Sequence, residues 1–509
     1  MSRARVLGLS RPPLSFAALA ALAITAVAPA AYAQTPGPKQ APNPQSAHAQ
    51  RPTAVVAQQP ATKKTVTRTQ RAAIAPGKIK NIVVIDLENE DYDVTFGADS
   101  PAAYLNTVLA KQGQIVENYY ATSHVSQGNY ISQISGQAST GTQNSDCIDL
   151  ASLSSGHITG AFTNITPGTP TSDGQVVGDG CVFPKSVATI GAQLDAAYGG
   201  SRKGAHTYRY PWRVYAEDMG NIPARDYGSP DTNPGAVGGT TCAHPPINGV
   251  DNSNSAVAGD GYATRHNPFM YFHSVIDDPS LCNERVVPLG TLSLGTGKKG
   301  KDTFTGHLVS DFKAKKTTPA FSFVIPDLCN DGHDATCQPA QAGGSDTDVE
   351  GGNGGGLTAA DLWLKHWVPT MMASPSYRSG EMLIVITLDE AGFNSTTSYA
   401  ALPGQPVGPN QSGNPGYSPI LGMMGYQEKD PTPGTYPGGG KTGALLLNKK
   451  YIAAGTVNTT GAYNHYSALR SYEDILGVTS GGTDGLGHLG YAGQAGLVPF
   501  GKDVFNARR

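Results

Sequence analysis

The chain has 509 residues, of which 39% are hydrophobic and 15% are charged, and its formal net charge is −3. The residues before Asp86 contain 11 of the 36 Lys and Arg residues and none of the 39 Asp and Glu residues, so the remainder carries a net charge of −14. Such an acidic body excludes nucleic acid as the expected partner, because the phosphate backbone requires a basic surface, whereas clustered carboxylates suit a divalent cation.

The first 33 residues have the features of a secretory signal peptide. Arg3, Arg5 and Arg11 precede an apolar run that starts at Leu14, and residues 31–33 (AYA) offer a cleavage site. The run is too short to span a bilayer, and no later stretch reaches the roughly 18 apolar residues that a membrane helix needs. We therefore expect a secreted or periplasmic protein without a transmembrane segment.

Residues 34–77 are rich in Pro, Ala and Gln, contain basic but no acidic residues, and lack hydrophobic periodicity. This composition predicts a disordered linker. The catalytic domain is then expected to occupy residues 78–509.

All six cysteines follow the predicted linker, and an exported protein is expected to join them in three disulfides. Sequence alone leaves 15 connectivities open. Pairing of neighbours closes the shortest loops and is the expected arrangement: Cys147 with Cys181, Cys242 with Cys282, and Cys329 with Cys337.

Short apolar runs predict buried strands at residues 80–87, 320–325, 382–388 and 443–447. Helical patterns alternate with them at residues 101–112, 187–198, 357–372 and 466–476. The fold class is therefore α/β, with a mostly parallel central sheet and helices on both faces. Long Gly- and Pro-rich loops at residues 140–183, 221–305 and 391–441 are expected to cover the carboxyl end of the sheet.

Polar pairs follow two of these predicted strands directly. Glu88-Asn89 comes after the first strand, and Asp389-Glu390 ends the string LIVITLDEAG. Open parallel sheets place their sites at such carboxyl ends. Buried neighbouring carboxylates are costly unless a cation compensates them, although a strand that simply exits to solvent is the alternative.

Ser126 lies between a candidate strand (QIVENYYA) and an amphipathic run (YISQISG). A serine at a helix start lies beside free N–H groups, where a phosphate also binds well. The alternative is that Ser126 only caps the helix.

Two histidines offer acid–base chemistry. His333 follows Asp327 in PDLCNDGHDATC, where a disulfide between Cys329 and Cys337 would hold it in place. A structural Asx-turn cluster is the alternative for this loop. His465 opens the helical pattern in YNHYSALRSYEDILG, although it could equally be an ordinary surface histidine.

The order of these strings resembles the bacterial phosphoesterase family, which includes secreted acid phosphatases and phosphocholine-type phospholipases C and belongs to the alkaline phosphatase superfamily. The similar strings are IVVIDLENEDYDVTFG, YYATSHVSQGNYISQISG, WRVYAEDM, HNPFMYF, FVIPDLCNDGHDATC, VITLDEAG and YNHYSALRSYEDILG. They extend from about residue 80 to residue 505 and thus cover nearly the whole predicted domain.

The resemblance implies a divalent cation, expected to be one per chain and of unknown identity. Its implied ligands are Glu88, Asn89, Ser126, Asp389 and Glu390. Related phosphodiesterases bind two zinc ions and have an Asp-His pair in place of the last two ligands, so we expect a single cation here.

The resemblance also implies that Ser126 is the nucleophile, three residues before Asn129, whose amide would meet the phosphate. His333 or His465 would be the general acid. In this mechanism we expect His124, His266 and Asp327 to contact the substrate.

We expect a phosphomonoesterase of the acid phosphatase type that forms a phosphoserine intermediate, with a phospholipase C-type phosphodiesterase as the alternative. A sulfatase would need the pattern Cys-x-Pro-x-Arg, and an α/β-hydrolase would need the pattern Gly-x-Ser-x-Gly. Neither pattern occurs in this sequence. A non-catalytic surface-binding protein on the same fold is the remaining alternative.

Overall fold

The computed structural model describes residues 71–507, with the exception of residues 156, 168–169, 200–207, 296–299, 335–354 and 393–437. The predicted signal peptide and residues 34–70 of the predicted linker therefore lie outside the described residues.

The centre of the fold is an eight-stranded sheet in which β1 (Asn81–Leu87) lies between β12 (Met382–Leu388) and β11 (Phe321–Ile325). All three strands are parallel and buried along their whole length, as their continuous apolar runs predict. The strand order is β14-β2-β13-β12-β1-β11-β4-β8. The outer strands are β2 (Gln114–Tyr120), β4 (Trp212–Ala216), β8 (Val286–Pro288), β13 (Ala444–Leu447) and β14 (Thr456–Asn464).

One strand, β13, runs antiparallel to both of its neighbours, and the other pairings are parallel. The N–H of Ala391 donates to the carbonyl of Gly439 at 2.8 Å, which shows that the chain returns to the carboxyl end of β12 before β13 begins. Because β13 starts at that end, it runs antiparallel to β12. The prediction of an α/β fold with a mostly parallel sheet is confirmed, as are the four strands predicted from apolar runs.

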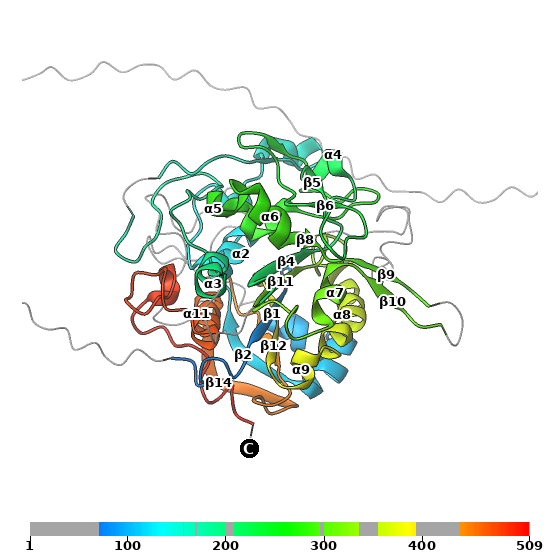
Figure 1. The fold of residues 1–509 in the computed structure, drawn as a ribbon, viewed down its shortest axis with the longest axis vertical. Coiled ribbons are helices and arrows are strands. Elements are labelled where there is room, and N and C mark those ends of the chain that lie inside the picture. The colour runs from blue at the N-terminus through cyan, green and yellow to red at the C-terminus, as the bar shows by residue number, and fades with distance from the viewer. Residues whose placement is uncertain are drawn as a thin grey trace, which may run out of the picture. The chain divides into compact units, whose positions relative to one another are not determined.

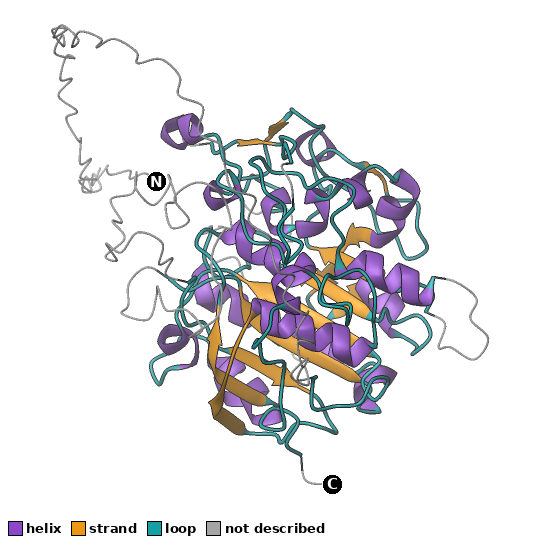
Figure 2. Ribbon diagram, turned by 90° about the vertical axis from the view of Figure 1, so that its left-hand side faces the viewer, coloured by secondary structure: helices purple, strands orange, loops and turns teal. Residues whose placement is uncertain are grey.

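Helices cover both faces of the sheet (Figures 1 and 2). One face packs against α2 (Ser126–Ser135), α3 (Ile190–Tyr198) and α11 (His465–Leu476), and the other packs against α8 (Gly356–Met372). Alternate residues of β1 enter the two cores: Ile82 and Val84 join the first, and Val83 and Ile85 join the second. This alternation follows from the two-residue period of a strand.

The remaining elements are short. The helix predicted at residues 101–112 is a π-helical turn, η1 (Leu105–Leu109), followed by a 3-10 turn, η2 (Ala110–Gln112). The other helices are α1 (Tyr92–Phe96), α4 (Pro223–Asp226), α5 (His273–Ile276), α6 (Pro279–Arg285), α7 (His307–Phe312) and α9 (Pro375–Arg378). Small two-stranded sheets pair β3 (Gly160–Ala161) with β7 (Val250–Asp251), β5 (Ser229–Pro230) with β6 (Thr240–Thr241), and β9 (Thr291–Ser293) with β10 (Thr303–Thr305).

Two disulfides cross-link loop segments of the described fold. Cys147 pairs with Cys181 and Cys242 pairs with Cys282, which confirms two of the predicted neighbour pairings. Cys329 is also disulfide-bonded, and its predicted partner, Cys337, lies outside the described residues.

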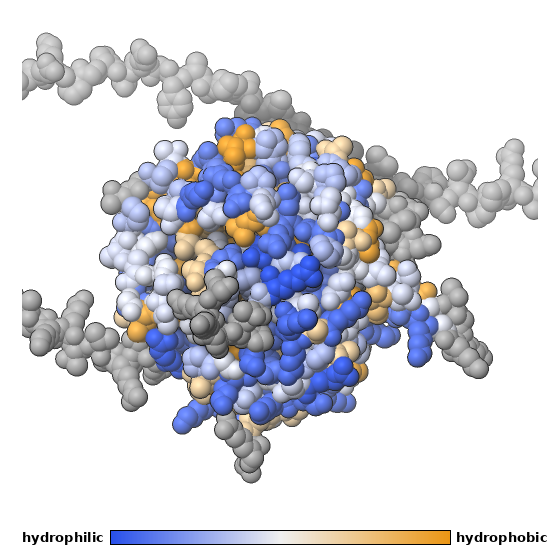
Figure 3. All heavy atoms as spheres, viewed as in Figure 1, coloured by the Kyte–Doolittle hydropathy of each residue, from blue (hydrophilic) through white to orange (hydrophobic). Residues whose placement is uncertain are grey.

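The face of the molecule shown in Figure 3 is mainly hydrophilic. The large hydrophobic side chains that the described surface exposes are six valines and two leucines spread along the chain from Val94 to Val498. Among the described helices, none has the length and apolarity that crossing a membrane would require.

The last residues of the predicted linker pack against the fold. Ala72 and Ile74 are buried, and Arg71 forms an ion pair with Asp474 at 2.9 Å. The N–H of Ala72 donates to the same carboxylate at 2.8 Å. Residues 71–77, which precede the domain start predicted at residue 78, therefore belong to the described fold, because two apolar side chains there are buried in the core.

We predict that two truncations will behave differently. Removal of residues 34–70 should leave stability unchanged, whereas removal of residues 34–75 should lower the free energy of unfolding by about 2–4 kcal/mol, since it exposes the site of Ile74 and removes the contacts of Arg71 and of the Ala72 N–H with Asp474. Chemical denaturation of the two variants checks this. Equal stabilities would show that residues 71–75 contribute nothing to the fold.

Candidate active site

Two strand ends bring the predicted carboxylates together. Leu87 and Leu388 are register partners at the ends of β1 and β12, so the residues that follow them lie side by side. Glu88, Asp389 and Glu390 are all buried. Burial raises the pKa of each carboxyl well above its ordinary value, and the charge of Asp389 adds to the rise at Glu88. Carboxylates in this state strongly favour a nearby positive charge.

Ser126 begins α2 and faces these carboxylates. Its hydroxyl donates to Glu88 Oε2 at 3.1 Å and lies 3.5 Å from Glu390 Oε1. The N-cap position belongs to Val125, which has no side-chain cap hydrogen bond. Ser126 is thus not a capping residue, and the alternative of a purely structural N-cap is wrong. Its side chain is only 5% exposed.

Asn129 holds the loop that precedes α2. Its Oδ1 accepts from the N–H groups of Thr122 and Ser123 at 2.9 and 3.0 Å, and its Nδ2 donates to the carbonyl of Ser123 at 2.8 Å. The amide predicted to contact phosphate is therefore directed at the backbone. Asn129 positions Ser126 and does not face the carboxylates.

Several buried oxygens near Ser126 lack a well-directed hydrogen bond. They are both carboxylate oxygens of Asp389 and Oδ1 of Asn89, although the nearby Ser126 hydroxyl partly opposes the rise in the pKa of Asp389. The Nδ2 of Asn89 donates to Glu390 Oε1 at 2.8 Å. Unpaired buried oxygens cost free energy, and carboxylate and amide oxygens are ligands of hard cations. The predicted ligand set therefore fits a divalent cation.

Further acidic residues come from the loop after β11. Two sets of side chains place possible ligand atoms within 4.8 Å of one another: Glu88, His333 and Asp334, and His266, Asp331 and Asp334. The Oδ1 of Asp331 accepts from the backbone N–H groups of His333 and Asp334, while its Oδ2 is buried and unpaired. Burial raises the pKa of Asp331. Together with Glu88, the acidic residues of this loop form a larger negatively charged region in which a cation would be favoured.

The two predicted histidines of this region differ in environment. His266 is buried, stacks on Tyr130 at a ring distance of 5.1 Å, and has Nε2 3.1 Å from Glu88 Oε1. Burial, and then the charge of Arg265, lower its pKa well below the ordinary value. The side chain of His333 is 48% exposed and lies 3.8 Å from Asp334. Of the two, His333 is the one that is accessible to solvent.

His124 and His465 contact Glu390 and Asp389, respectively. The Nδ1 of His124 contacts Glu390 Oε2. The Nε2 of His465 lies 2.6 Å from the carbonyl oxygen of Asp389 and must donate to it, so Nδ1 accepts from the Tyr119 hydroxyl at 3.1 Å. Burial lowers the pKa of His465 to about 4. With both nitrogens engaged, His465 can hold Asp389 in place but has no proton to offer a substrate.

Arg265 is a buried cation that sequence reasoning missed. It is 4% exposed, and its Nη2 contacts Asp334 Oδ1 at 2.7 Å. Its Nε lies 3.6 Å from Asp146 Oδ2, and Asp146 Oδ1 accepts the N–H of Gln127 at 2.8 Å. Arg265 therefore lies near the start of α2, beside Ser126. The only sequence signal was its position next to His266.

Asp327, predicted as a substrate contact, makes hydrogen bonds with the backbone of its own loop. Its Oδ1 accepts the N–H groups of Cys329 and Asn330, both at 2.9 Å, and its own N–H donates to Glu217 Oε2 at 3.0 Å. This is the Asx-turn arrangement that the sequence left open as the alternative. Asp327 shapes the loop that carries Asp331 and His333.

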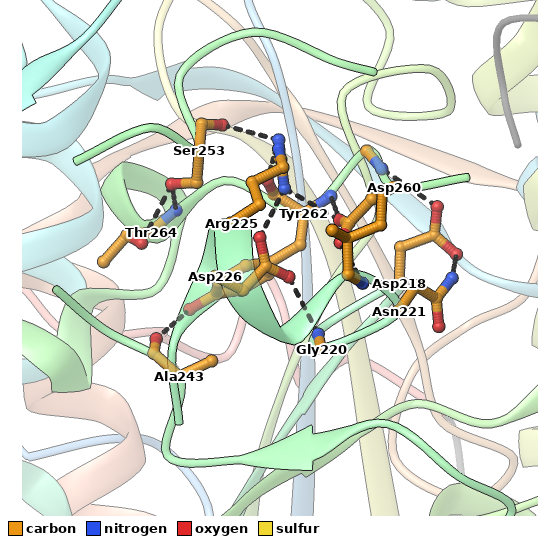
Figure 4. A network of polar contacts seen from close by, with 12 residues as sticks. Asp218, Gly220, Asn221, Arg225, Asp226, Ala243, Ser253, Asp260, Tyr262 and Thr264 are labelled. Carbon is orange, nitrogen blue, oxygen red and sulfur yellow. Dashed lines mark hydrogen bonds and ion pairs between the residues drawn. The ribbon is translucent and has the colours of Figure 1, made fainter. Parts of the chain in front are cut away.

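A polar network holds the segment that delivers Arg265 and His266 (Figure 4). The Nη1 of Arg225 contacts Asp226 at 2.5 Å and Asp260 at 2.8 Å. Its Nη2 donates to three backbone carbonyls, those of Ser253, Ser255 and Tyr262. Since Tyr262 is only three residues before Arg265, this network, which we call the Arg225 clasp, positions one wall of the site.

Comparisons of sequence find distant relatives among fungal acid phosphatases. The acid phosphatase of Aspergillus fumigatus is 22% identical over 312 residues, which are 61% of this chain and 45% of that protein. The probable acid phosphatase of Kluyveromyces lactis is 24% identical over 312 residues, 61% of this chain and 47% of that protein. The phosphate-repressible acid phosphatase of Penicillium chrysogenum is 22% identical over 320 residues, 62% of this chain and 48% of that protein. The chain spans about half the length of these curated relatives, and no family model matches it.

Comparisons of structure find weak overall similarities. A protein in the alkaline phosphatase superfamily from Vibrio parahaemolyticus has a TM-score of 0.38 at 11% identity, with 84% of this chain and 74% of that chain covered. The lipoteichoic acid synthase LtaP from Listeria monocytogenes has a TM-score of 0.36 at 9% identity, covering 82% and 75%. A putative sulfatase from Bacteroides thetaiotaomicron has a TM-score of 0.36 at 10% identity, covering 84% and 75%.

We predict that Asp260 of the Arg225 clasp makes a contribution to the free energy of unfolding that falls as pH rises. Burial, and then the Asp226 carboxylate, raise the pKa of Asp260 to about 9, from about 3.9 in an unfolded chain. The fold thus favours the protonated form, and this contribution is lost as pH rises from about 4 to 9. Asp260→Asn keeps a neutral hydrogen-bond donor, so its denaturation midpoint should depend less on pH than that of the parent. Exposed Asp99→Asn is the charge-matched control, and equal pH dependences of Asp260→Asn and the parent would contradict the assignment.

Proposed function

Because the chain is a distant homologue of fungal acid phosphatases, we propose that it is an exported, metal-dependent phosphoester hydrolase that acts on phosphomonoesters through Ser126. One observation carries the proposal: a serine hydroxyl at the start of α2 donates to buried Glu88 at 3.1 Å, beside the unpaired carboxylate of Asp389. Serine alone is a weak nucleophile and needs such an activating environment.

A single divalent cation would be held by Glu88, Asn89, Asp389 and Glu390, with the Ser126 hydroxyl completing the set. The raised pKa values of the three carboxyls support this location, and so do the buried oxygens of Asp389 and Asn89 Oδ1, which lack a well-directed hydrogen bond. When bound, the cation would lower the pKa of the serine hydroxyl and neutralise charge on the phosphate.

Ser126 would attack phosphorus in line with the leaving oxygen, while Glu88 accepts the hydroxyl proton through the hydrogen bond already present. The N-terminus of α2 and the nearby Arg265 guanidinium would meet the charge that spreads over the phosphate oxygens. Asn129 would keep the loop before α2 in position through its backbone hydrogen bonds.

His333 is the residue we assign to protonation of the leaving oxygen and to activation of the water that later hydrolyses the phosphoserine. It is half exposed and lies next to Asp334, whereas His465 is buried with both ring nitrogens engaged. Its position in a loop allows contact with a leaving group that extends toward solvent.

A phosphomonoester is the substrate we propose, because the distant relatives carry the name acid phosphatase. Incubation with an aryl phosphate and with phosphatidylcholine under a panel of divalent cations tests this. Release of phosphocholine without turnover of the aryl phosphate would replace the monoester proposal with a phosphodiesterase.

We predict that Ser126→Ala abolishes turnover of an aryl phosphate, with a loss of at least about a thousandfold, or roughly 4 kcal/mol of barrier. The fold should be little changed, because the hydroxyl does not cap α2. Steady-state kinetics and a thermal melt check both points.

Ser123→Ala is the matched control, since Ser123 lies on the same loop but its hydroxyl contacts Ser139 at 3.1 Å and not a carboxylate. It should retain most of the activity. A Ser126→Ala variant with activity within about tenfold of the parent, roughly 1.4 kcal/mol of barrier, would end the nucleophile assignment.

We also predict that a divalent cation raises the melting temperature of the chelated protein, because it relieves repulsion among buried carboxylates. Asp389→Asn should abolish this rise along with activity. Asp361→Asn is the control: Asp361 is buried and accepts N–H groups of Tyr104 and Leu105 on α8's side of the sheet, so its loss should lower the melting temperature but leave the response to the cation intact. An unchanged response in Asp389→Asn would place the cation elsewhere.

A further inference from the structure

The first turn of α2 receives its cap from a different segment of the chain. The helix begins at Ser126, and the side chain of its N-cap residue, Val125, makes no cap hydrogen bond. Asp146 Oδ1 instead accepts the N–H of Gln127, the second residue of the helix, at 2.8 Å. A cap side chain normally accepts from the second or third N–H of its helix. Asp146 thus provides the interaction that Val125 lacks, one residue away from Ser126.

The backbone around Asp146 is held in an uncommon conformation. Asp146 and Cys147 both have a φ of 53°, in the left-handed region that residues other than glycine seldom adopt. Asp146 follows a 3-10 turn, η3 (Gln143–Ser145), and its N–H donates to the carbonyl of Gln143 at 3.0 Å. Cys147 is joined to Cys181 by a disulfide. Such a conformation persists only where the surrounding contacts impose it, and here it accompanies a carboxylate that is directed at α2.

The second carboxylate oxygen of Asp146 faces Arg265. Its Oδ2 lies 3.6 Å from Arg265 Nε, and Nη2 of the same guanidinium contacts Asp334 at 2.7 Å. Asp146 is only 6% exposed. Burial raises its pKa to about 6, although Arg265 and the N–H of Gln127 oppose the rise, so the carboxyl is mainly ionised at neutral pH. Asp146 therefore connects the start of α2 with the guanidinium beside it.

We propose that Asp146 is a positioning residue for the reaction at Ser126: by capping α2 through the N–H of Gln127, it fixes the backbone that carries the Ser126 hydroxyl. The inference rests on the proposed function, because it concerns the same nucleophile. Glu88, and not Asp146, receives the hydrogen bond of that hydroxyl. Asp146 acts through the helix start, since the first N–H groups of a helix have no partner within the helix and need one from outside.

Two substitutions in the full chain separate the cap from other effects. Asparagine keeps an oxygen that can accept the N–H of Gln127, and it is as good a cap as aspartate, whereas alanine offers no acceptor. With an aryl phosphate, kcat of Asp146→Ala should fall at least about thirtyfold while KM changes less than about threefold, because a misplacement of about 1 Å can cost about a hundredfold in rate. Asp146→Asn should stay within about fivefold of the parent, since it keeps the cap.

The melting temperature shows whether the rest of the site survives. Asp146 is not among the proposed cation ligands, so Asp146→Ala should keep the rise in melting temperature that a divalent cation causes in the parent. Loss of this rise together with activity would show a collapsed site and would overturn a positioning role. Asp146→Asn keeps the cap, so a fall in its kcat as large as that of Asp146→Ala would also overturn the role, even if the alanine variant proves unstable.

Asp179→Ala is the matched control. Asp179 lies in the same loop, and its Oδ1 accepts the N–H groups of Thr142 and Gly180 at 2.8 and 2.9 Å, but it is exposed and does not cap α2. This variant should keep the kcat of the parent. An equal fall in kcat for Asp179→Ala and Asp146→Ala would assign the effect to loop stability and overturn the proposal.

Ser126→Ala, assayed in parallel, separates this inference from the proposed function. Retained turnover in Ser126→Ala would overturn the nucleophile and the positioning role with it. Lost turnover in Ser126→Ala with an unchanged kcat in Asp146→Ala would leave the nucleophile in place and overturn the role of Asp146 alone.

Discussion

Burial of several carboxylates at one edge of a fully covered sheet is the constraint on which the rest of the site depends. β1 and β12 are apolar along their whole length and parallel, so the chain can become polar only where they end. Glu88 and Asp389 meet there, out of water, with raised pKa values. A buried carboxylate without compensation is expensive, so the surrounding elements either donate to these groups or leave room for positive charge.

The donors come from segments far apart in the sequence. Ser126 and Tyr130 on α2 both donate to Glu88, at 3.1 and 2.7 Å. His465, at the start of α11, holds the backbone of Asp389. Both helices lie on the same face of the sheet, and α2 packs against α11. Ser126, the proposed nucleophile, and the acidic residues beside it are thus held by one packed layer of helices, which would reduce the motion needed before reaction.

Polar contacts and a disulfide hold the long loops in place at this end of the sheet. The Arg225 clasp ties α4 to the backbone of Ser253 and Tyr262 and thereby fixes the segment that carries Arg265. The disulfide between Cys147 and Cys181 secures the neighbourhood of Asp146, which receives the N–H of Gln127. Such networks stabilise a loop only when nearly all partners are satisfied, which makes their geometry sensitive to single substitutions.

The sequence by itself determined four strands of the central sheet, because a continuous, β-branched apolar run such as MLIVITL favours a strand that is covered on both faces. For the same reason it located Glu88, Asp389 and Glu390 at one edge, and loop length favoured the disulfides of Cys147 and Cys242. Tertiary structure decided what local pattern does not encode: the reversed direction of β13, the inward packing of Ile74, and the turning of Asn129 and Asp327 toward the backbone. The tertiary structure also placed Arg265 in the site. Arg265 and the carboxylate of Asp334 are far apart in the sequence, so only the folded structure shows that they form an ion pair.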